Sequence, residues 1–233
     1  MKNARMKYIC ARDKNPLVPG HYYLYNWVKP FLKKNAKILD IGCWTGPLEQ
    51  LFANERCHVT GIDIENEPLK FVRKKFPQFT FKNASITEKL PFKKNAFDVV
   101  LYFMVIEHIP QGTELDSLKI INQVLKKDGQ LFFNTMHDNF LSNLLDPAYF
   151  FGHRHYSRKN LEKMLKKAGF KIESVTYNAG FFTTLHIILL YFYKHVLRRN
   201  EPRNKVLDWL MEQDYKNRGF VEIDIRARKI KDI

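Results

Sequence analysis

Cysteine is scarce in this sequence, and the few cysteines are spaced for neither a disulfide framework nor a metal site. Only Cys10, Cys43 and Cys57 occur, with none of the paired spacings that such sites require. The N-terminal residues, Met1 to Arg5, also lack the apolar core of a secretory signal. We therefore expect reduced thiols and a cytoplasmic protein.

Long hydrophobic runs, repeats, low-complexity tracts and Gly/Ser linkers are also missing. A chain of 233 residues with 45% hydrophobic content is sufficient for one domain with a substantial core. The longest apolar stretch, 181–197, contains two histidines and a lysine, and it is shorter than the roughly 20 apolar residues that a spanning helix needs. We expect one domain over residues 1–233.

Acidic residues are outnumbered, with 24 Asp and Glu against 39 Lys and Arg, which gives a net charge of +15. Such a charge attracts polyanions: nucleic acid, anionic lipid or phosphorylated substrates. The basic residues are scattered over the chain rather than gathered in one arm, and they are equally consistent with solvated lysines. Nucleic acid is therefore the less favoured partner.

The most informative segment is 37–46. Apolar residues run into Asp40, and a turn containing Gly42 and Gly46 then leads into a helical pattern over 47–54. Such a loop lets a ligand approach bare backbone and unpaired N–H groups. About twenty residues later a second predicted strand ends in Asp63, where an acid can accept hydrogen bonds from both hydroxyls of a ribose. Together these features predict a nucleoside-binding half-fold.

The loop differs from a dinucleotide site. A dinucleotide-binding loop reads Gly-x-Gly-x-x-Gly and directs N–H groups at a pyrophosphate, whereas here Trp44 lies between Gly42 and Gly46. Asp40 would repel a diphosphate but would suit a cation such as a sulfonium or an ammonium. A nucleotide-dependent oxidoreductase is therefore disfavoured.

Five ordered motifs over residues 36–177 resemble the class I S-adenosylmethionine-dependent methyltransferases. They are the loop at 38–46, the acidic motif at 61–64, the segment 84–92, the strand and loop at 97–110, and Leu125-Lys-Lys-Asp-Gly-Gln-Leu-Phe-Phe133. The resemblance implies an α/β, Rossmann-like fold. Its sheet would have seven mostly parallel strands, helices on both faces and an antiparallel last strand.

The resemblance also implies S-adenosylmethionine as cofactor and assigns its contacts residue by residue. The implied cofactor-binding residues are Asp40, Gly42, Cys43, Trp44, Gly46, Asp63, Ile64, Ser85, Ile86 and Phe103. Two of them depart from the family pattern. Trp44 replaces the middle glycine of the loop, and Ser85 replaces an acid on the adenine side.

Candidate catalytic residues follow the fourth and fifth predicted strands, because ligands of open α/β sheets lie beyond the carboxyl ends of the strands. Glu107 and His108 follow the fourth strand, and His153 and His155 lie in a loop after the fifth. His108 is our first choice as base, since a histidine near neutrality suits deprotonation of a hydroxyl. Arg154, between His153 and His155, is a candidate to bind a carboxylate or phosphate of the acceptor.

Glu107-His108 and the segment 132–136 are most similar to the ubiquinone-biosynthesis O-methyltransferases. Some of those enzymes bind a metal through an earlier Glu and the Glu-His pair. Met104 stands at the position of that earlier Glu, and a thioether is a poor ligand for a hard cation. We therefore expect no metal.

From residue 37 onward, predicted strands alternate with predicted helices, and this alternation predicts a parallel sheet. The expected strands are 37–41, 58–63, 79–83, 97–103, 129–136, 171–175 and 221–227. We also expect a helical cap over the cofactor cleft at 18–34 and a helical insertion at 179–218. The apolar segment 181–197 is either a helix packed on the sheet, a homodimer interface, or an interfacial helix on an anionic membrane.

The sequence thus predicts a methyltransferase acting on a small molecule, with a hydroxyl on a lipid, quinone or glycan as the leading acceptor. Two alternatives stay open. One is an RNA methyltransferase, which only the net charge favours. The other is a non-catalytic adapter with the same fold that binds a membrane or a partner through 181–197.

Overall fold

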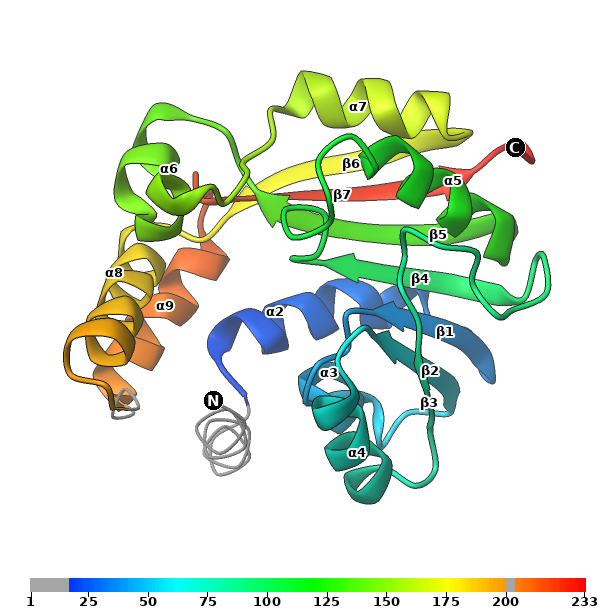
Figure 1. Cartoon of the computed structure of the whole chain (residues 1–233), viewed down its shortest axis with the longest axis horizontal. Helices are drawn as coiled ribbons and strands as arrows, with labels where there is room; N and C mark the ends of the chain where they lie inside the picture. Colours follow the sequence, from blue (N-terminus) through cyan, green and yellow to red (C-terminus); the bar gives the residue numbers. More distant parts are fainter. Residues whose placement is uncertain (1–16, 200–203) are drawn as a thin grey trace.

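A computed structural model describes residues 17–199 and 204–233. The N-terminal residues Met1 to Arg5 and Cys10 lie outside these residues. A single sheet of seven strands, in the order β3-β2-β1-β4-β5-β7-β6, runs through the molecule with helices on both faces (Figure 1). This arrangement confirms the predicted Rossmann-like class.

The strands begin and end close to the expected positions. They are β1 (Ala36–Ile41), β2 (Cys57–Asp63), β3 (Thr80–Asn83), β4 (Phe97–Phe103), β5 (Leu125–Met136), β6 (Phe170–Asn178) and β7 (Glu222–Lys229). β1 pairs in parallel with β2 and with β4. β7 lies antiparallel between β5 and β6, as the resemblance implied. β5 begins four residues earlier than predicted, because Leu125 already pairs with Phe97.

One face of the sheet is covered by α5 (Glu114–Val124) and α7 (Arg158–Lys167). The apolar stripe of α5 enters the main core through Leu118 and Ile121, and α7 enters it through Leu161. Ser157 caps α7 by accepting from the Asn160 N–H, and Gly169 follows the helix with φ +80°. Both ends of α7 therefore follow from the sequence.

The other face is covered by α2 (Pro19–Val28), continued by η1 (Lys29–Phe31), and by α3 (Pro47–Phe52). Leu24, Val28 and Phe52 are buried against strand residues of this face. The expected cap at 18–34 thus lies along the sheet, and the Tyr23 hydroxyl near its start donates to Asp224 at 2.8 Å. That α2 also covers the cofactor cleft stays a prediction.

Three further helices were not predicted from the sequence as separate elements. They are α6 (Phe140–Leu145), the short 3-10 helix η2 (Pro147–Phe151) and α9 (Lys205–Lys216). Side chains cap all three: Asn139 caps α6, Asp146 caps η2 and Asn204 caps α9. A further helix, α4 (Asn66–Lys75), covers β2 and β3 as the alternation predicts.

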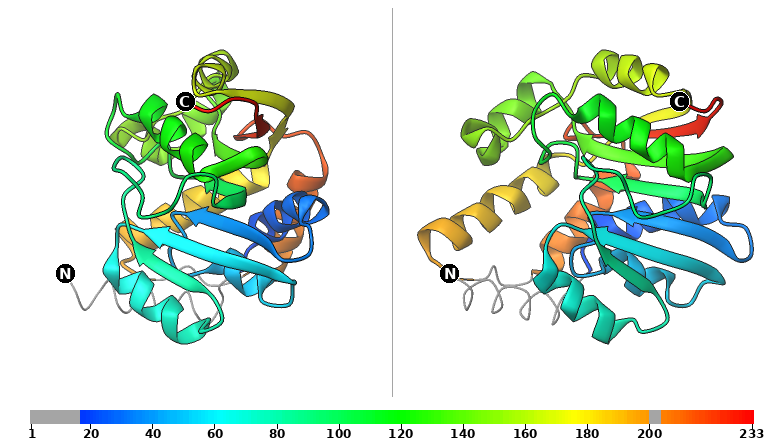
Figure 2. Two further views of the ribbon diagram at one scale, coloured as in Figure 1. Left: turned by 90° about the vertical axis from the view of Figure 1, so that its right-hand side faces the viewer. Right: turned by 45° about the vertical axis from the view of Figure 1, so that its right-hand side comes forward.

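The apolar segment 181–197 forms α8 (Phe181–Tyr191) and a π-helical turn, η3 (Phe192–Val196). α8 packs on α9 and touches η2, and in the right-hand view of Figure 2 it projects away from the sheet. Its buried side chains are Thr183 and Thr184, while Phe181 is 62% exposed. Packing on the sheet, one of the three expectations, is therefore wrong. No helix in the described ranges is long and apolar enough to cross a bilayer.

Candidate functional site

The predicted site residues meet at the carboxyl ends of the parallel strands. Asp40 lies beside Gly61 of β2 and Leu101 of β4, so the chain leaves β1, β2 and β4 at the same edge. β5 ends next to β4, with Phe103 paired to Asn134. The loops after these four strands therefore surround one site.

The glycine loop after β1 requires glycine at two positions. Gly42 and Gly46 have φ +80° and +72°. Residues that carry a side chain rarely adopt this backbone conformation. A Cβ on Gly42 would lie 2.6 Å from Val105 Cγ2, and one on Gly46 would lie 2.8 Å from Phe76 Cε2. The loop thus keeps a bare backbone, and Val105 brings the loop after β4 directly against it.

Trp44 adopts φ +46° at the position where the family has glycine. Its backbone N–H donates to Asp63 Oδ2 at 3.0 Å, while the Glu65 N–H donates to Oδ1 at 2.8 Å. The substitution therefore leaves the loop geometry in place, and that loop orients Asp63. Each carboxylate oxygen of Asp63 retains a further lone pair for a ribose hydroxyl.

Two carboxyls lie buried beneath the glycine loop. Asp40 is the penultimate residue of β1, and Glu49 lies in the first turn of α3 with its side chain fully buried. Burial raises the pKa of Asp40 to about 7 and that of Glu49 well above its ordinary value. A buried acidic site next to a bare backbone fits a cationic nucleoside such as S-adenosylmethionine, which supplies an electrophilic methyl group when bound.

The residues assigned to the adenosine side flank this loop. Ile64 follows Asp63 and is 69% exposed, and Ile86 is buried in the main core. The Ser85 hydroxyl pairs with Thr87 Oγ1 at 2.8 Å. Phe103 ends β4 and lies near the Trp27 ring. Their contacts with adenine stay predictions.

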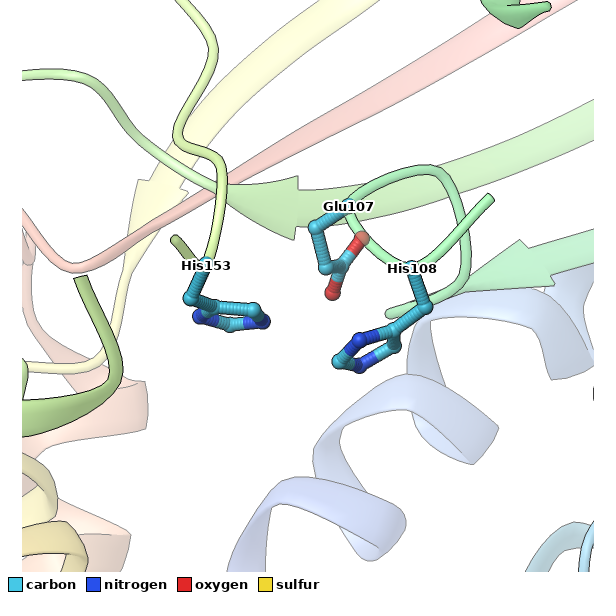
Figure 3. A group of neighbouring side chains, drawn as sticks. All are labelled: Glu107, His108 and His153. Carbon is cyan, nitrogen blue, oxygen red and sulfur yellow. The ribbon is translucent and has the colours of Figure 1, made fainter. Parts of the chain in front are cut away.

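The structure brings Glu107, His108 and His153 together (Figure 3). The His108 and His153 rings stack with centroids 5.0 Å apart. The Glu107 carboxyl is buried: Oε2 accepts from the Thr135 hydroxyl at 2.9 Å, and Oε1 has no hydrogen-bond partner. Burial raises the pKa of Glu107 to about 7. Desolvation, followed by the charges of His153 and Arg154, lowers the pKa of His108.

Asp146 organises the two histidines of the later loop, and sequence reasoning missed it. Its Oδ2 lies 3.0 Å from His153 Nδ1 and 3.0 Å from His155 Nε2. The His155 side chain is wholly buried, and its Nδ1 lies 2.7 Å from Asn143 Oδ1. His155 is therefore engaged at both nitrogens, whereas His153 has only its Nδ1 engaged. The one available signal was the Asp-Pro pair that starts η2.

Arg154 binds the chain itself rather than an open anion site. Its Nη2 donates to the Ile106 carbonyl at 2.9 Å and to the Ile109 carbonyl, and its Nη1 pairs with Glu114. The expectation that Arg154 holds an acceptor anion is therefore wrong. Arg154 fixes the loop that carries Glu107 and His108, and the Tyr156 hydroxyl donates to the same Ile106 carbonyl.

Two sets of side chains are close enough to share one metal ion: Glu107 with His108 and His153, and Asp146 with His153 and His155. In each set the ligand atoms lie within 4.8 Å of one another. That the protein works without a metal stays a prediction.

A model of the family described as "Methyltransferase domain" matches residues 14–175, more than half of the chain. Among curated proteins, the chain is 30% identical over 112 residues to the ubiquinone biosynthesis O-methyltransferase of Vibrio atlanticus, and 31% identical over 115 residues to that of Vibrio campbellii. These matches cover 46% of the chain and 46–47% of the relatives. The chain thus spans about half the length of the curated relatives it matches.

Solved structures share the fold over most of the chain. A SAM-dependent methyltransferase from Methanosarcina mazei superposes with a TM-score of 0.64 at 18% identity, over 88% of this chain and 97% of that chain. The [4+2]-cyclase SpnF superposes with a TM-score of 0.65 at 20% identity, over 88% and 80%. At this identity the likeness is one of fold, and the cyclase illustrates that the fold alone does not fix the chemistry.

We expect the stability of the ligand-free protein to fall between pH 5.5 and 7.5. Six carboxyls have raised pKa values: Asp40, Glu49, Asp63, Glu107, Glu222 and Asp224. An acid with a raised pKa holds its proton in the folded state and loses that stabilisation as the pH rises through the folded pKa. Each contributes up to about 1.4 kcal/mol per pH unit.

The lowered pKa values of His108 and His137 act in the opposite direction, but they are fewer. Calorimetric melting at constant ionic strength checks this expectation. A melting temperature that stays level or rises from pH 5.5 to 7.5 would show that these carboxyls are solvated.

The Asp63→Ala variant should bind S-adenosylhomocysteine about 1–3 kcal/mol more weakly, because it loses charge-assisted hydrogen bonds to the ribose. Titration calorimetry of the variant beside the unmodified chain measures the difference. Because Asp63 also accepts from Trp44 and Glu65, Asp63→Asn serves as the matched variant that keeps the shape. Unchanged affinity in both variants would remove Asp63 from the ribose site.

Proposed function

Because the chain belongs to the family of class I S-adenosylmethionine-dependent methyltransferase domains, we propose that it transfers a methyl group to a hydroxyl of a small apolar acceptor. The observation that carries this proposal is the cluster of Glu107, His108 and His153, which directly adjoins the glycine loop through Val105. A lipid or quinone is the acceptor that the surroundings of the cluster favour.

The chain has two tasks in such a reaction: to align the acceptor oxygen and to take its proton. His153 is suited to taking the proton of the acceptor. Asp146 binds its Nδ1, so that Nε2 is the ring nitrogen left for the acceptor. Such a carboxylate partner sets the tautomer and the orientation of the ring. His108 stacks on His153 from the loop after β4, and its lowered pKa keeps it neutral at pH 7.

Glu107 assists the two histidines. A carboxyl oxygen of Glu107 lies close to ring nitrogens of His108 and His153, and Oε1 has no hydrogen-bond partner. A pKa near 7 allows the carboxyl to gain or lose a proton in the working pH range. An acceptor hydroxyl bound next to Glu107 would supply the missing hydrogen bond to Oε1. We assign Glu107 to acceptor positioning and the imidazole pair, His108 and His153, to proton removal.

The acceptor class follows from the surface beside the cluster. η2 ends at Phe151, two residues before His153, and Phe150 and Phe151 are 67% and 85% exposed. The neighbouring helices add further exposed apolar side chains: Phe140, Leu144, Phe181, Leu185, Ile188 and Phe192. We call this surface, formed by α6, η2 and α8, the apolar face.

Basic residues border the apolar face. Lys194, Arg198 and Arg199 follow α8 and are exposed, and the whole chain has a charge of +15. An apolar surface with a basic border is suited to the interface of an anionic bilayer. We propose that the apolar face docks on such a surface and receives the acceptor from it.

The His153→Ala variant should slow methyl transfer about 100-fold or more, the size of a general-base effect, while its affinity for S-adenosylhomocysteine stays unchanged. The assay is transfer of a labelled methyl group into a lipid extract. His58→Ala, which alters an exposed histidine of β2, is the matched control. Equal rates for both variants would contradict the proton role of His153.

A chelator should leave this transfer rate unchanged, because the proposal uses the cluster for proton transfer. EDTA treatment followed by addition of Mg²⁺, Mn²⁺ or Zn²⁺ tests this expectation. Activity lost with EDTA and restored by one ion would mean that a metal, rather than the imidazole pair, activates the hydroxyl.

The chain should float with vesicles that contain phosphatidylglycerol, and the double variant Phe151→Ser/Leu185→Ser should float at least about five-fold less, because burial of each large side chain contributes about 1.5–3 kcal/mol. Ile230→Ser removes an exposed apolar side chain near the C-terminal end, away from the apolar face in Figure 1. It should float like the unmodified chain.

Equal flotation of the double variant would remove the membrane role of the apolar face. If the unmodified chain instead forms a dimer in light scattering, and only the double variant is monomeric, the apolar face is a subunit interface.

A further inference from the structure

Glu49 is a buried carboxyl whose side-chain hydrogen-bond partner is another acid, Asp40. Its side chain is 0% exposed, in the first turn of α3 and directly after the glycine loop. An ionised carboxyl in such a place loses its hydration without compensation, which costs several kcal/mol. A leucine would fill this position without that cost. The presence of an acid here therefore indicates a role in binding a ligand.

Among the described residues, the charged side chains that interact with Glu49 are acids rather than bases. Asp40 from β1 and Cys43 from the glycine loop lie close enough for their charges to interact with it. Asp63 from β2 adds its charge to that of Asp40. Among the ion pairs between described residues, none includes Asp40, Glu49 or Asp63.

We propose that Glu49 and Asp40 form a two-carboxyl seat for the ammonium group at the amino-acid end of S-adenosylmethionine, and that a proton leaves this seat when the cation binds. The inference rests on the cofactor of the proposed function and adds a residue that none of the five motifs contains. Of the two, only Asp40 was expected from the sequence to suit a cation such as an ammonium.

The release of a proton on binding follows from charge balance. Without a ligand the two neighbouring carboxyls share at least one proton, since two like charges cannot both be ionised at close range in a buried site. An ammonium ion supplies the positive charge that the proton supplied before, so the proton is released to solvent. The Cys43 thiol stays neutral throughout, because burial and the adjacent acids raise its pKa.

Comparing two ligands distinguishes binding at this seat from binding at the rest of the cofactor site. S-adenosylhomocysteine carries the ammonium, whereas 5′-methylthioadenosine keeps the nucleoside and lacks the amino-acid end. In titration calorimetry, Glu49→Gln should bind S-adenosylhomocysteine about 10-fold to 100-fold more weakly, as expected for a hydrogen bond between charged groups. Its affinity for 5′-methylthioadenosine should change less than about two-fold.

A second measurement needs no variant. Titrations of the unmodified chain with S-adenosylhomocysteine at pH 6.5, in buffers of different ionisation enthalpy, should show release of a proton. Titrations with 5′-methylthioadenosine should show none. The ligand-free Glu49→Gln variant should also melt at a higher temperature than the unmodified chain, because it no longer buries a second acid next to Asp40.

The outcomes are distinct. Equal weakening for both ligands, or no proton release with S-adenosylhomocysteine, overturns the seat and leaves Glu49 a structural residue. A lower melting temperature with unchanged ligand discrimination does the same. Failure of the unmodified chain to bind either ligand would instead overturn the cofactor assignment of the proposed function.

Discussion

The interaction on which this site depends is the desolvation of carboxyl groups at one edge of the sheet. Parallel pairing of β1, β2 and β4 places Asp40 and Asp63 at the same edge, and the loop after β4 adds Glu107. The antiparallel β7 begins at this edge and contributes Glu222 and Asp224. Fold stability at neutral pH is therefore limited by the groups that the chemistry needs, a conflict expected where a site is built before its ligand arrives.

The buried acids fall into two groups according to their partners. Asp224 accepts hydrogen bonds from Tyr23, Asn134 and Asn178, and it ties α2, β5 and β6 together. Glu49 and one oxygen of Glu107 have no such partners. Acids of the first group are compensated within the protein and brace the strands. Acids of the second group are compensated only from outside, one by a cation and the other by a hydroxyl in our proposals.

Much of the fold was predictable from the sequence, because strand and helix periodicity, the Ser157 cap and the Gly169 stop are local signals. The site was predictable only where motifs record it, as for Asp40, Gly42 and Asp63. The role of Arg154 depends on carbonyls more than forty residues away, and Asp146 meets His153 through a 3-10 turn without a motif. The roles of Arg154 and Asp146 therefore depend on the residues that they contact in the fold, and not on their residue types alone. The exposure of α8 could not be predicted either, because the sequence of an apolar helix is similar whether the helix packs on a sheet or faces outward.

The position of β7 has a consequence for how the chain reaches this state. β7 pairs with β5 on one side and β6 on the other, although it follows both in sequence. During synthesis β5 and β6 therefore emerge with a gap of one strand between them, and their facing edges stay unpaired until residue 229 is available. Unpaired edges attract other strands, so the interval between synthesis of β6 and insertion of β7 is when this chain is most exposed to misassociation. The buried Lys229 ammonium, which donates to the carbonyls of Asn122 and Leu125, then fastens the end of the inserted strand to α5 and β5.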